Sequence, residues 1–321
     1  MEKKLLIYSF PDKNPEYLQP QIDSYKKYME TDNTELIIIN SSNSHKETID
    51  DICKNNSIQC ITYGGNRDVP WSNYYVEQLN WFRDNIQINI NDNILFIHSD
   101  MFFINKLDYK RLLNDKKIIF NPQYRDTPYH PINDGNFNYF YMWDGVLLFD
   151  SGYFNENNLT KLFDWGYIGG VSDVGGKTHT LISSLNKNDY DFFEFFNYNS
   201  LDKNILEVHL NGNIQYLINI DDKIFSEKKP QIGNRSFPYE NEHENYEKYL
   251  SEKFLKIKKE FIDNYEFLPP VSIDIIQFKN DEISEAPIFH FKSGTGYSPH
   301  YNQTYAEIKL NQIKKIINRE L

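Results

Sequence analysis

NILFIHSDMFFI, residues 93–104, consists of two apolar runs that are separated by the polar triplet His98-Ser99-Asp100. The first run follows a turn signal and contains Ile, Leu and Phe, which is typical of a short strand buried on both faces. The triplet then lies at the carboxyl end of that strand, where ligands bind in open α/β sheets. A carboxylate among apolar neighbours costs free energy unless it holds a cation or accepts hydrogen bonds. The sequence therefore predicts a functional site at this strand end; an acid that only caps the strand is the alternative.

Strand and helix signals alternate along the residues that precede this stretch. Three apolar runs have the length of strands: residues 5–10, 36–39 and 58–63. Asn14 and Pro15 suit the start of a first helix, and Ser44-His45-Lys46-Glu47 has the form of a capping box for a second. A further helix is expected over residues 72–84. Connections this short favour parallel neighbours, so we expect a β-α-β-α-β arrangement.

Strand signals also dominate much of the chain after residue 105. We expect strands at residues 117–122, 141–149, 192–196 and 288–291, and a hairpin of residues 206–210 and 214–220. The hairpin would turn at Asn211-Gly212. Residues 123–139 read as a long loop, and such loops are usually functional or disordered. Apolar residues at spacings of three and four predict helices over residues 242–265 and 304–318.

The bulk composition restricts the class of protein. Of the 321 residues, 25% are charged and 40% are hydrophobic, as in an ordinary globular enzyme. The net charge of −12 argues against a nucleic-acid partner, which would favour a basic face. No segment approaches the roughly 20 apolar residues of a transmembrane helix, and we interpret residues 5–10 as a strand rather than part of a signal peptide. Cys53 and Cys60 form no disulfide framework, so a cytoplasmic location is the default.

The phrase Ile97-His98-Ser99-Asp100-Met101 resembles a motif of the nucleotide-sugar glycosyltransferases with the GT-A fold. In that family an apolar strand ends in Asp-x-Asp, whose acids hold a divalent metal on the diphosphate of the donor. The resemblance implies that Asp100 is a metal ligand. His98, which stands in place of the first acid, would be a second ligand or a phosphate donor. The metal would be manganese or magnesium, and imidazole suits softer metals better than it suits magnesium.

A second phrase of the family is matched later in the chain. Several GT-A families end their catalytic domain with His-Phe-x-Gly-x-x-Lys-Pro-Trp, and residues 290–297 read HFKSGTGY. The resemblance implies that His290 completes the metal site and that Lys292, Ser293 and Gly294 donate to diphosphate oxygens. The Lys-Pro-Trp part is absent here. A histidine on an apolar strand can also be a core residue, which is the alternative for His290.

Three further segments match donor-side positions of the family less specifically. Asp144-Gly145-Val146 resembles a phrase in which an acid contacts the sugar hydroxyls and a Gly lets the sugar lie close to the backbone, so Asp144 and Gly145 are candidates. Arg67 follows Gly64-Gly65 in a loop that lines the ribose and diphosphate in the family, where it would neutralise phosphate charge. Tyr8, in the first strand, is a weaker candidate for a nucleotide contact. A solvated turn is the alternative for the Arg67 loop.

Residues 164–177 are unusually rich in glycine and are followed by a helix signal near Thr178. In the family, the acceptor side carries an acid just before such a helix. Asp173 is our candidate for the general base that deprotonates the acceptor hydroxyl, and Trp165 is our candidate platform for a sugar ring. If the reaction retains configuration, Asp173 would only bind the acceptor. A flexible lid with a structural Asp is the alternative.

These features together predict an α/β protein with a GT-A-like (nucleotide-diphospho-sugar transferase) mixed sheet flanked by helices in a single large domain. Residues 1–104 would form the donor-binding half, and residues 105–321 the acceptor-binding half with the C-terminal helices. The expected function is transfer of a sugar from a nucleotide-sugar donor to a carbohydrate or other hydroxyl acceptor, with a divalent metal on the diphosphate. The alternatives are a catalytically idle carbohydrate-binding or scaffolding protein on the same fold, and a nucleotidyltransferase. The lack of a Gly-rich, basic loop after the first strand argues against the last.

Overall fold

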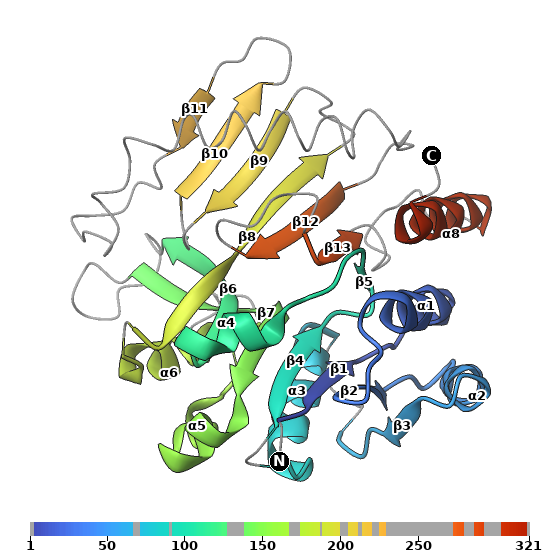
Figure 1. Cartoon of the computed structure of the whole chain (residues 1–321), viewed down its shortest axis with the longest axis horizontal. Coiled ribbons are helices and arrows are strands. Elements are labelled where there is room, and N and C mark those ends of the chain that lie inside the picture. Colours follow the sequence, from blue (N-terminus) through green and yellow to red (C-terminus); the bar gives the residue numbers. More distant parts are fainter. Residues whose placement is uncertain are drawn as a thin grey trace. The chain divides into compact units, whose positions relative to one another are not determined.

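The computed structural model describes most of the chain. The described residues are 3–66, 71–89, 92–126, 138–166, 174–186, 188–199, 205–210, 214–219, 225–228, 272–278, 286–291 and 303–319. The chain separates into two compact units, each assembled from several segments (Figure 1). The first unit contains Met1–Pro15, Glu30–Ser99 and Asp108–Phe192, and the second contains Glu16–Met29, Asp100–Leu107 and Phe193–Leu321. The helix predicted over residues 242–265 lies outside the described residues.

Four parallel strands form one part of the sheet in the first unit. They are β1 (Leu5–Ser9), β2 (Thr34–Asn40), β3 (Gln59–Thr62) and β4 (Asn93–Ile97), in the order β4-β1-β2-β3. β1 pairs in parallel with β2 and β4, and β2 pairs in parallel with β3. All five residues of β4 are buried. The predicted β-α-β-α-β arrangement and the predicted two-sided burial of the strand before His98 are therefore confirmed.

Antiparallel pairing makes the sheet of the first unit mixed. β7 (Asn138–Asp150) pairs antiparallel with β4 and with β6 (Ile118–Asp126), and β6 pairs in parallel with the first residues of β8 (Tyr190–Asn199). The loop predicted over residues 123–139 is wrong at both of its ends, because Gln123 pairs with Tyr141 and Asp126 pairs with Asn138. The prediction gave more weight to the Pro, Asn and Asp residues of this segment than to its aromatic residues, which favour strands.

Helices cover the sheet of the first unit. They are α2 (Lys46–Asn55), α3 (Trp71–Asn85), α4 (Tyr109–Asp115), α5 (Ser151–Glu156) and α6 (His179–Ser184). α3 packs on the sheet through Phe82, whose ring centroid lies 4.6 Å from that of Tyr8 and 4.8 Å from that of Phe96. The capping box predicted at Ser44 is wrong. His45 is the N-cap of α2 without a side-chain hydrogen bond, and its backbone N–H donates to Ser42 Oγ at 3.0 Å.

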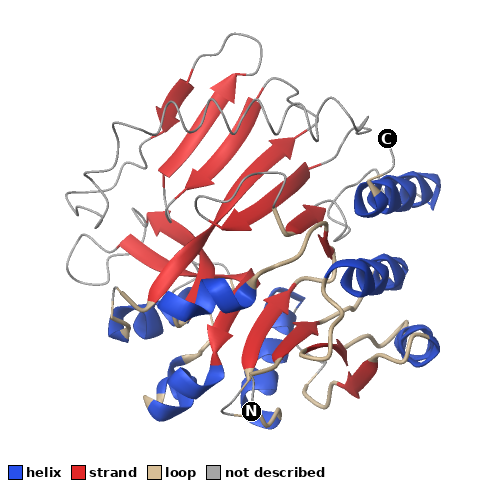
Figure 2. Ribbon diagram, in the orientation of Figure 1, coloured by secondary structure: helices blue, strands red, loops and turns tan. Residues whose placement is uncertain are grey.

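The second unit contains an antiparallel sheet (Figure 2). Its strand order is β11-β10-β9-β8-β12-β13-β5, in which β8 takes part through the residues that follow Phe192. The other strands are β5 (Met101–Phe103), β9 (Ile205–Leu210), β10 (Ile214–Asn219), β11 (Phe225–Lys228), β12 (Ser272–Phe278) and β13 (Ile288–Phe291). The two strands of the predicted hairpin are confirmed, because Leu210 pairs with Ile214 in an antiparallel register, whereas the predicted turn at Asn211-Gly212 lies outside the described residues.

The short strand β5 is held by hydrogen bonds from helix α1 (Leu18–Tyr28) in addition to its pairing with β13. Gln21 Nε2 donates to the carbonyl oxygen of Met101 at 2.9 Å, and the backbone N–H of Phe103 donates to Ser24 Oγ at 3.1 Å. The last helix, α8 (Gln303–Asn318), lies against α1, where Tyr28 Oη donates to the carbonyl oxygen of Ile317 at 2.6 Å. These contacts fix the backbone that directly follows Asp100.

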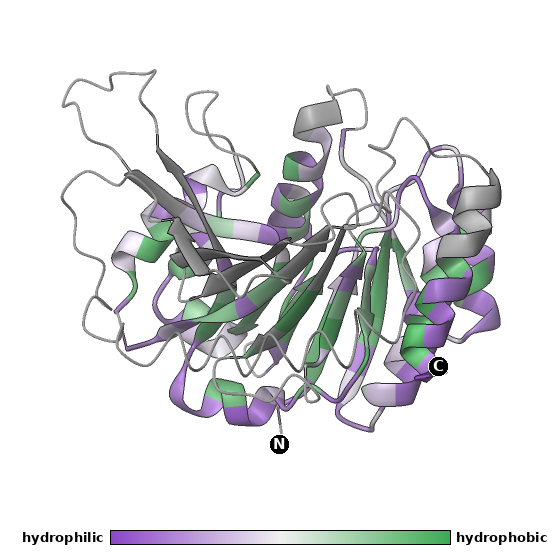
Figure 3. Cartoon of the chain, turned by 90° about the horizontal axis from the view of Figure 1, so that it is seen from above, coloured by the Kyte–Doolittle hydropathy of each residue, from purple (hydrophilic) through white to green (hydrophobic). Residues whose placement is uncertain are grey.

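The strands that Figure 3 colours by hydropathy are mostly hydrophobic, and they supply much of the apolar interior. The coloured helices carry both hydrophobic and hydrophilic residues. This distribution is what sheets covered by amphipathic helices require. The mixed α/β architecture with flanking helices that the sequence predicts is confirmed. Within the described residues, no helix is long and apolar enough to cross a membrane.

Candidate metal centre

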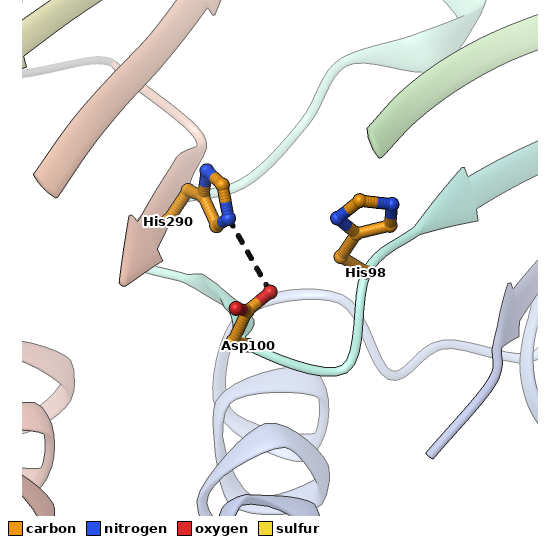
Figure 4. A group of neighbouring side chains, drawn as sticks. All are labelled: His98, Asp100 and His290. Carbon is orange, nitrogen blue, oxygen red and sulfur yellow. Dashed lines mark ion pairs between the residues drawn. The ribbon is translucent and has the colours of Figure 1, made fainter. Parts of the chain in front are cut away.

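The candidate site begins with a buried carboxylate and a buried imidazole that the second unit brings together. Asp100 directly precedes β5, and His290 lies in β13, where it pairs with Met101. The backbone N–H of Phe291 donates to the carbonyl oxygen of Asp100 at 2.9 Å. The side chains meet on this backbone frame, with His290 Nε2 lying 3.3 Å from Asp100 Oδ1, and they are only 4% and 2% exposed (Figure 4).

His98 joins this pair through the turn between β4 and β5. Only Ser99 separates it from Asp100, so the turn itself brings the two side chains close. One ligand atom from each of His98, Asp100 and His290 lies within 4.8 Å of the other two. We call these three residues the His–Asp–His cluster. Figure 4 shows one ring nitrogen of His98 on the side of the other two residues.

The His–Asp–His cluster has the chemistry of a divalent metal site. Ligands that bind one ion at about 2.1 Å lie about 3.0 Å apart when adjacent and about 4.2 Å apart when opposite. The 4.8 Å limit therefore requires only small side-chain movements for all three atoms to reach one ion. Two imidazoles and one carboxylate suit Mn²⁺, Fe²⁺, Co²⁺ or Zn²⁺ better than Mg²⁺, which prefers oxygen ligands. The residues present thus fit a divalent ion.

Aromatic rings and a carboxylate of the first unit surround His98. The ring centroids of Tyr75 and Trp143 each lie 5.2 Å from that of His98, both in edge-to-face geometry. His98 Nε2 lies 3.5 Å from Asp144 Oδ2, and the backbone N–H of His98 donates to the carbonyl oxygen of Gly145 at 3.1 Å. These contacts restrict the position of a side chain that is 20% exposed.

Gly145 and Trp143 depend on each other in this arrangement. A Cβ atom at position 145 would overlap the six-membered ring of Trp143, so the lack of a side chain leaves room for the indole. The indole in turn contacts the ring of His98. The space beside the Cα of Gly145 is therefore filled by Trp143 in this structure. The sequence resemblance assigns Gly145 to a contact with the donor sugar. In this structure Gly145 makes room for the ring of Trp143, which packs on His98.

Two other candidates from the sequence lie in the apolar interior of the first unit. Tyr8 is 2% exposed and packs on Phe82, and burial, followed by the nearby Asp92 and Glu35 carboxylates, raises the pKa of its phenol. Trp165 is 3% exposed, and its ring stacks on that of Phe163 with the centroids 5.9 Å apart. Neither ring presents an open face here, so the proposed contacts with nucleotide and sugar stay predictions.

The remaining candidates lie outside the described residues: Arg67, Asp173, Lys292, Ser293 and Gly294. Sequence reasoning overlooked Tyr75 and Trp143, which pack on His98. A signal existed for Trp143, because it directly precedes Asp144 in the phrase that resembles the family motif. Tyr75 lies within the helix predicted over residues 72–84, and nothing in the sequence there distinguishes it from a core residue.

The segment that follows residue 173 is attached to β7 by a turn that requires glycine. Gly175 has φ +95°, and a Cβ atom there would overlap the carbonyl oxygen of Met142. Thr178 Oγ1 accepts a hydrogen bond from the backbone N–H of Met142 at 2.9 Å and donates to the carbonyl oxygen of Gly175 at 2.6 Å. The turn thereby docks residues 174–178 beside the strand that carries Asp144.

We expect Gly175→Ala to destabilise the protein by at least about 2 kcal/mol, because it adds left-handed strain and a clash with backbone. Urea denaturation followed by circular dichroism measures the loss of unfolding free energy. Gly166→Ala is the control, since a Cβ there would meet Asp164 and Lys177 side-chain atoms at 3.0 Å, and Gly166 has no left-handed φ. Equal losses for the two variants would contradict the role given to the turn at Gly175.

Comparisons with known proteins give structural matches only. No protein-family model matches the sequence, and no curated protein matches it. Among solved structures, the chain is similar to the glycosyltransferase GlyE of Streptococcus pneumoniae TIGR4, with a TM-score of 0.36 and 13% identity over 60% of this chain and 45% of GlyE. It is also similar to the galactosyltransferase LgtC, solved with donor and acceptor sugar analogues, with a TM-score of 0.38 and 15% identity over 58% of this chain and 72% of LgtC.

A third similar structure is the bifunctional glycosyltransferase WbbM, with a TM-score of 0.32 and 9% identity over 51% of this chain and 34% of WbbM. The chain thus spans less than half the length of GlyE and about a third of the length of WbbM. These three proteins are glycosyltransferases. With TM-scores of 0.32 to 0.38, the matches carry no conclusion about the activity or substrate of this chain.

Proposed function

We propose that this protein is a glycosyltransferase that moves a sugar from a nucleotide-diphosphate donor to a carbohydrate or other hydroxyl acceptor. The observation that carries the proposal is the His–Asp–His cluster. In it, the buried Asp100 Oδ1 and His290 Nε2 atoms lie 3.3 Å apart, directly after the turn that follows β4. A buried carboxylate is costly unless it serves a cation or donors. The cluster therefore suits a divalent ion at the strand end where α/β sheets bind their ligands.

The three side chains of the cluster would act together in this reaction. Asp100, His290 and His98 would each supply one ligand atom to the ion. A bound ion would supply positive charge that offsets the negative charge of the leaving diphosphate, which is electrostatic rather than covalent catalysis. Because two of the three ligands are imidazoles, we expect manganese to support the reaction better than magnesium.

The other residues singled out in the sequence complete the proposal. Donor contacts are proposed for Tyr8, Arg67, Gly145, Lys292, Ser293 and Gly294, and acceptor contacts for Trp165 and Asp173. Asp173 would deprotonate the acceptor hydroxyl if the reaction inverts configuration, and Asp144 would assist near the donor sugar. Residues 1–104 would be the donor-binding half and residues 105–321 the acceptor-binding half. A cytoplasmic role in carbohydrate biosynthesis belongs to the same proposal.

A melting-temperature screen tests the donor site. The protein is heated with UDP, GDP, CDP and dTDP sugars, each with and without Mn²⁺, and release of free sugar is measured in parallel. A ligand at about 100 times its Kd stabilises the native state by about 2.7 kcal/mol. We expect one nucleotide to raise Tm only when Mn²⁺ is present and its sugar to be released. No shift with any nucleotide sugar would refute the proposal, and a shift without turnover would favour a catalytically idle binding protein.

A further inference from the structure

His98 has a polar partner on the side of its ring that faces away from the rest of the cluster. Its Nε2 atom lies 3.5 Å from Asp144 Oδ2, and the side chain of Asp144 is 8% exposed. The other ring nitrogen, Nδ1, is the one that Figure 4 shows on the side of Asp100 and His290. A single imidazole thus has a carboxylate at one nitrogen and the candidate metal position at the other.

The ring of His98 is also held sterically. Tyr75 and Trp143 approach it edge to face, with interplanar angles of 82° and 66°. The backbone N–H of His98 is tied to Gly145, the residue that directly follows Asp144. The backbone hydrogen bond and the carboxylate contact therefore reach His98 from adjacent residues of β7, so the orientation of the ring depends on this strand.

We propose that Asp144 is a positioning residue that orients His98 for metal binding. A neutral imidazole has one donor nitrogen and one acceptor nitrogen. If Nδ1 uses its lone pair to bind the ion, Nε2 must carry the proton, and a small movement that shortens the 3.5 Å separation would let Asp144 Oδ2 accept that N–H. Carboxylates that accept a hydrogen bond from a metal-binding histidine fix its tautomer and ring orientation and raise its basicity as a ligand.

The separation of 3.5 Å is long for a hydrogen bond, and the inference expects it to shorten when the ion binds. The inference rests on the proposed metal site and deepens it, because it assigns a function to a carboxylate that does not itself bind the ion. It also differs from the direct contact with donor sugar predicted from the sequence. Metal binding measured without any nucleotide or sugar separates these two roles of Asp144.

The test measures the Kd of Mn²⁺ from the electron paramagnetic resonance signal of the free ion, with no nucleotide present. The wild type is compared with Asp144→Ala, Asp144→Asn, Asp100→Asn and the control Asp164→Asn. Asp164 is a partly exposed carboxylate of the first unit that pairs with Lys177 at 3.2 Å. We expect Asp144→Ala to bind Mn²⁺ roughly 10-fold to 100-fold more weakly, as is usual when the partner of a metal-binding histidine is lost.

Asp144→Asn keeps an acceptor oxygen without the charge, so we expect a smaller loss, of about 10-fold, at the lower end of that range. Asp164→Asn should bind Mn²⁺ like the wild type. Circular dichroism and the Tm of the metal-free proteins check that each variant folds. If Asp144→Ala does not fold, the comparison rests on Asp144→Asn, for which an unchanged Kd overturns the inference.

Two results would overturn the inference in different ways. If Asp100→Asn loses Mn²⁺ while both Asp144 variants keep the wild-type Kd, the metal site stands and the positioning role of Asp144 is wrong. If the wild type binds no Mn²⁺, or if Asp100→Asn binds it as well as the wild type does, the metal site itself is refuted and the role of Asp144 is refuted with it.

Discussion

Asp100→Asn is expected to remove most of the stabilisation of the protein by Mn²⁺ without destabilising the metal-free protein. The side chain of Asp100 is 2% exposed, and its neighbour in the cluster is a histidine at 3.3 Å. A buried carboxylate carries a desolvation cost that a neutral amide of the same shape avoids. We therefore expect the Tm of metal-free Asp100→Asn to equal or exceed that of the wild type.

Although the metal-free variant should be at least as stable as the wild type, it should gain less stability from Mn²⁺. At a Mn²⁺ concentration of about 100 times its Kd, the wild type should gain about 2.7 kcal/mol, or about 4 °C in Tm for a chain of this length. An amide is a poor substitute for a charged ligand, and a loss of about 100-fold in affinity would reduce the gain to about 0.4 kcal/mol. If the proposed function holds, turnover should fall by at least about 100-fold.

Glu194→Gln is a matched control for this experiment. Glu194 lies in β8 of the second unit and is 2% exposed, so the same change of carboxylate to amide occurs at a buried residue that is not a member of the cluster. The substitution can change the Tm of the metal-free protein, but the rise in Tm on adding Mn²⁺ should match that of the wild type. A full Mn²⁺ response in Asp100→Asn would contradict the assignment of Asp100 as a ligand.

The strand before Asp100 was predictable because both of its faces are buried. Its residues form a continuous apolar run, and the structure buries all five of them. The strand ends of β6 and β7, where Gln123 pairs with Tyr141, were missed because Pro, Asn and Asp residues were given more weight than the aromatic residues of the same segment. The start of α2 was misplaced because its N-cap is His45, a residue type that cap preferences do not favour.

The meeting of Asp100 with His290 depends on strand register, which periodicity in the sequence does not reveal. His290 pairs with Met101, and only a family resemblance suggested that these two distant segments belong together. The sequence also does not reveal which aromatic residues, 16% of the chain, are buried in the core and which could contact a ligand. From the sequence, Trp165 is a candidate platform for a sugar ring. In the structure its ring instead packs on Phe163 in the interior.

The second large effect is expected for Phe102→Ala, in the middle of β5. Phe102 is fully buried, lies opposite Phe289 of β13, and has its ring centroid 6.3 Å from that of Tyr17. Truncating a buried phenylalanine leaves a cavity and costs about 3–5 kcal/mol of unfolding free energy. Because β5 directly follows Asp100, we also expect the affinity for Mn²⁺ to fall. Urea denaturation and Mn²⁺ titration of the native fraction measure the two losses separately.

Phe154→Ala separates a local effect on the cluster from a general loss of stability. Phe154 is equally buried, but it lies in α5 of the first unit, where its ring contacts Phe149 and Phe163. We expect it to lose a similar amount of unfolding free energy and to keep the wild-type Kd for Mn²⁺. If Phe102→Ala does not fold, Phe102→Leu provides the milder change. Equal Kd values for the Phe102 and Phe154 variants would contradict the role of β5 in positioning Asp100, because only Phe102 lies in the strand that directly follows this ligand.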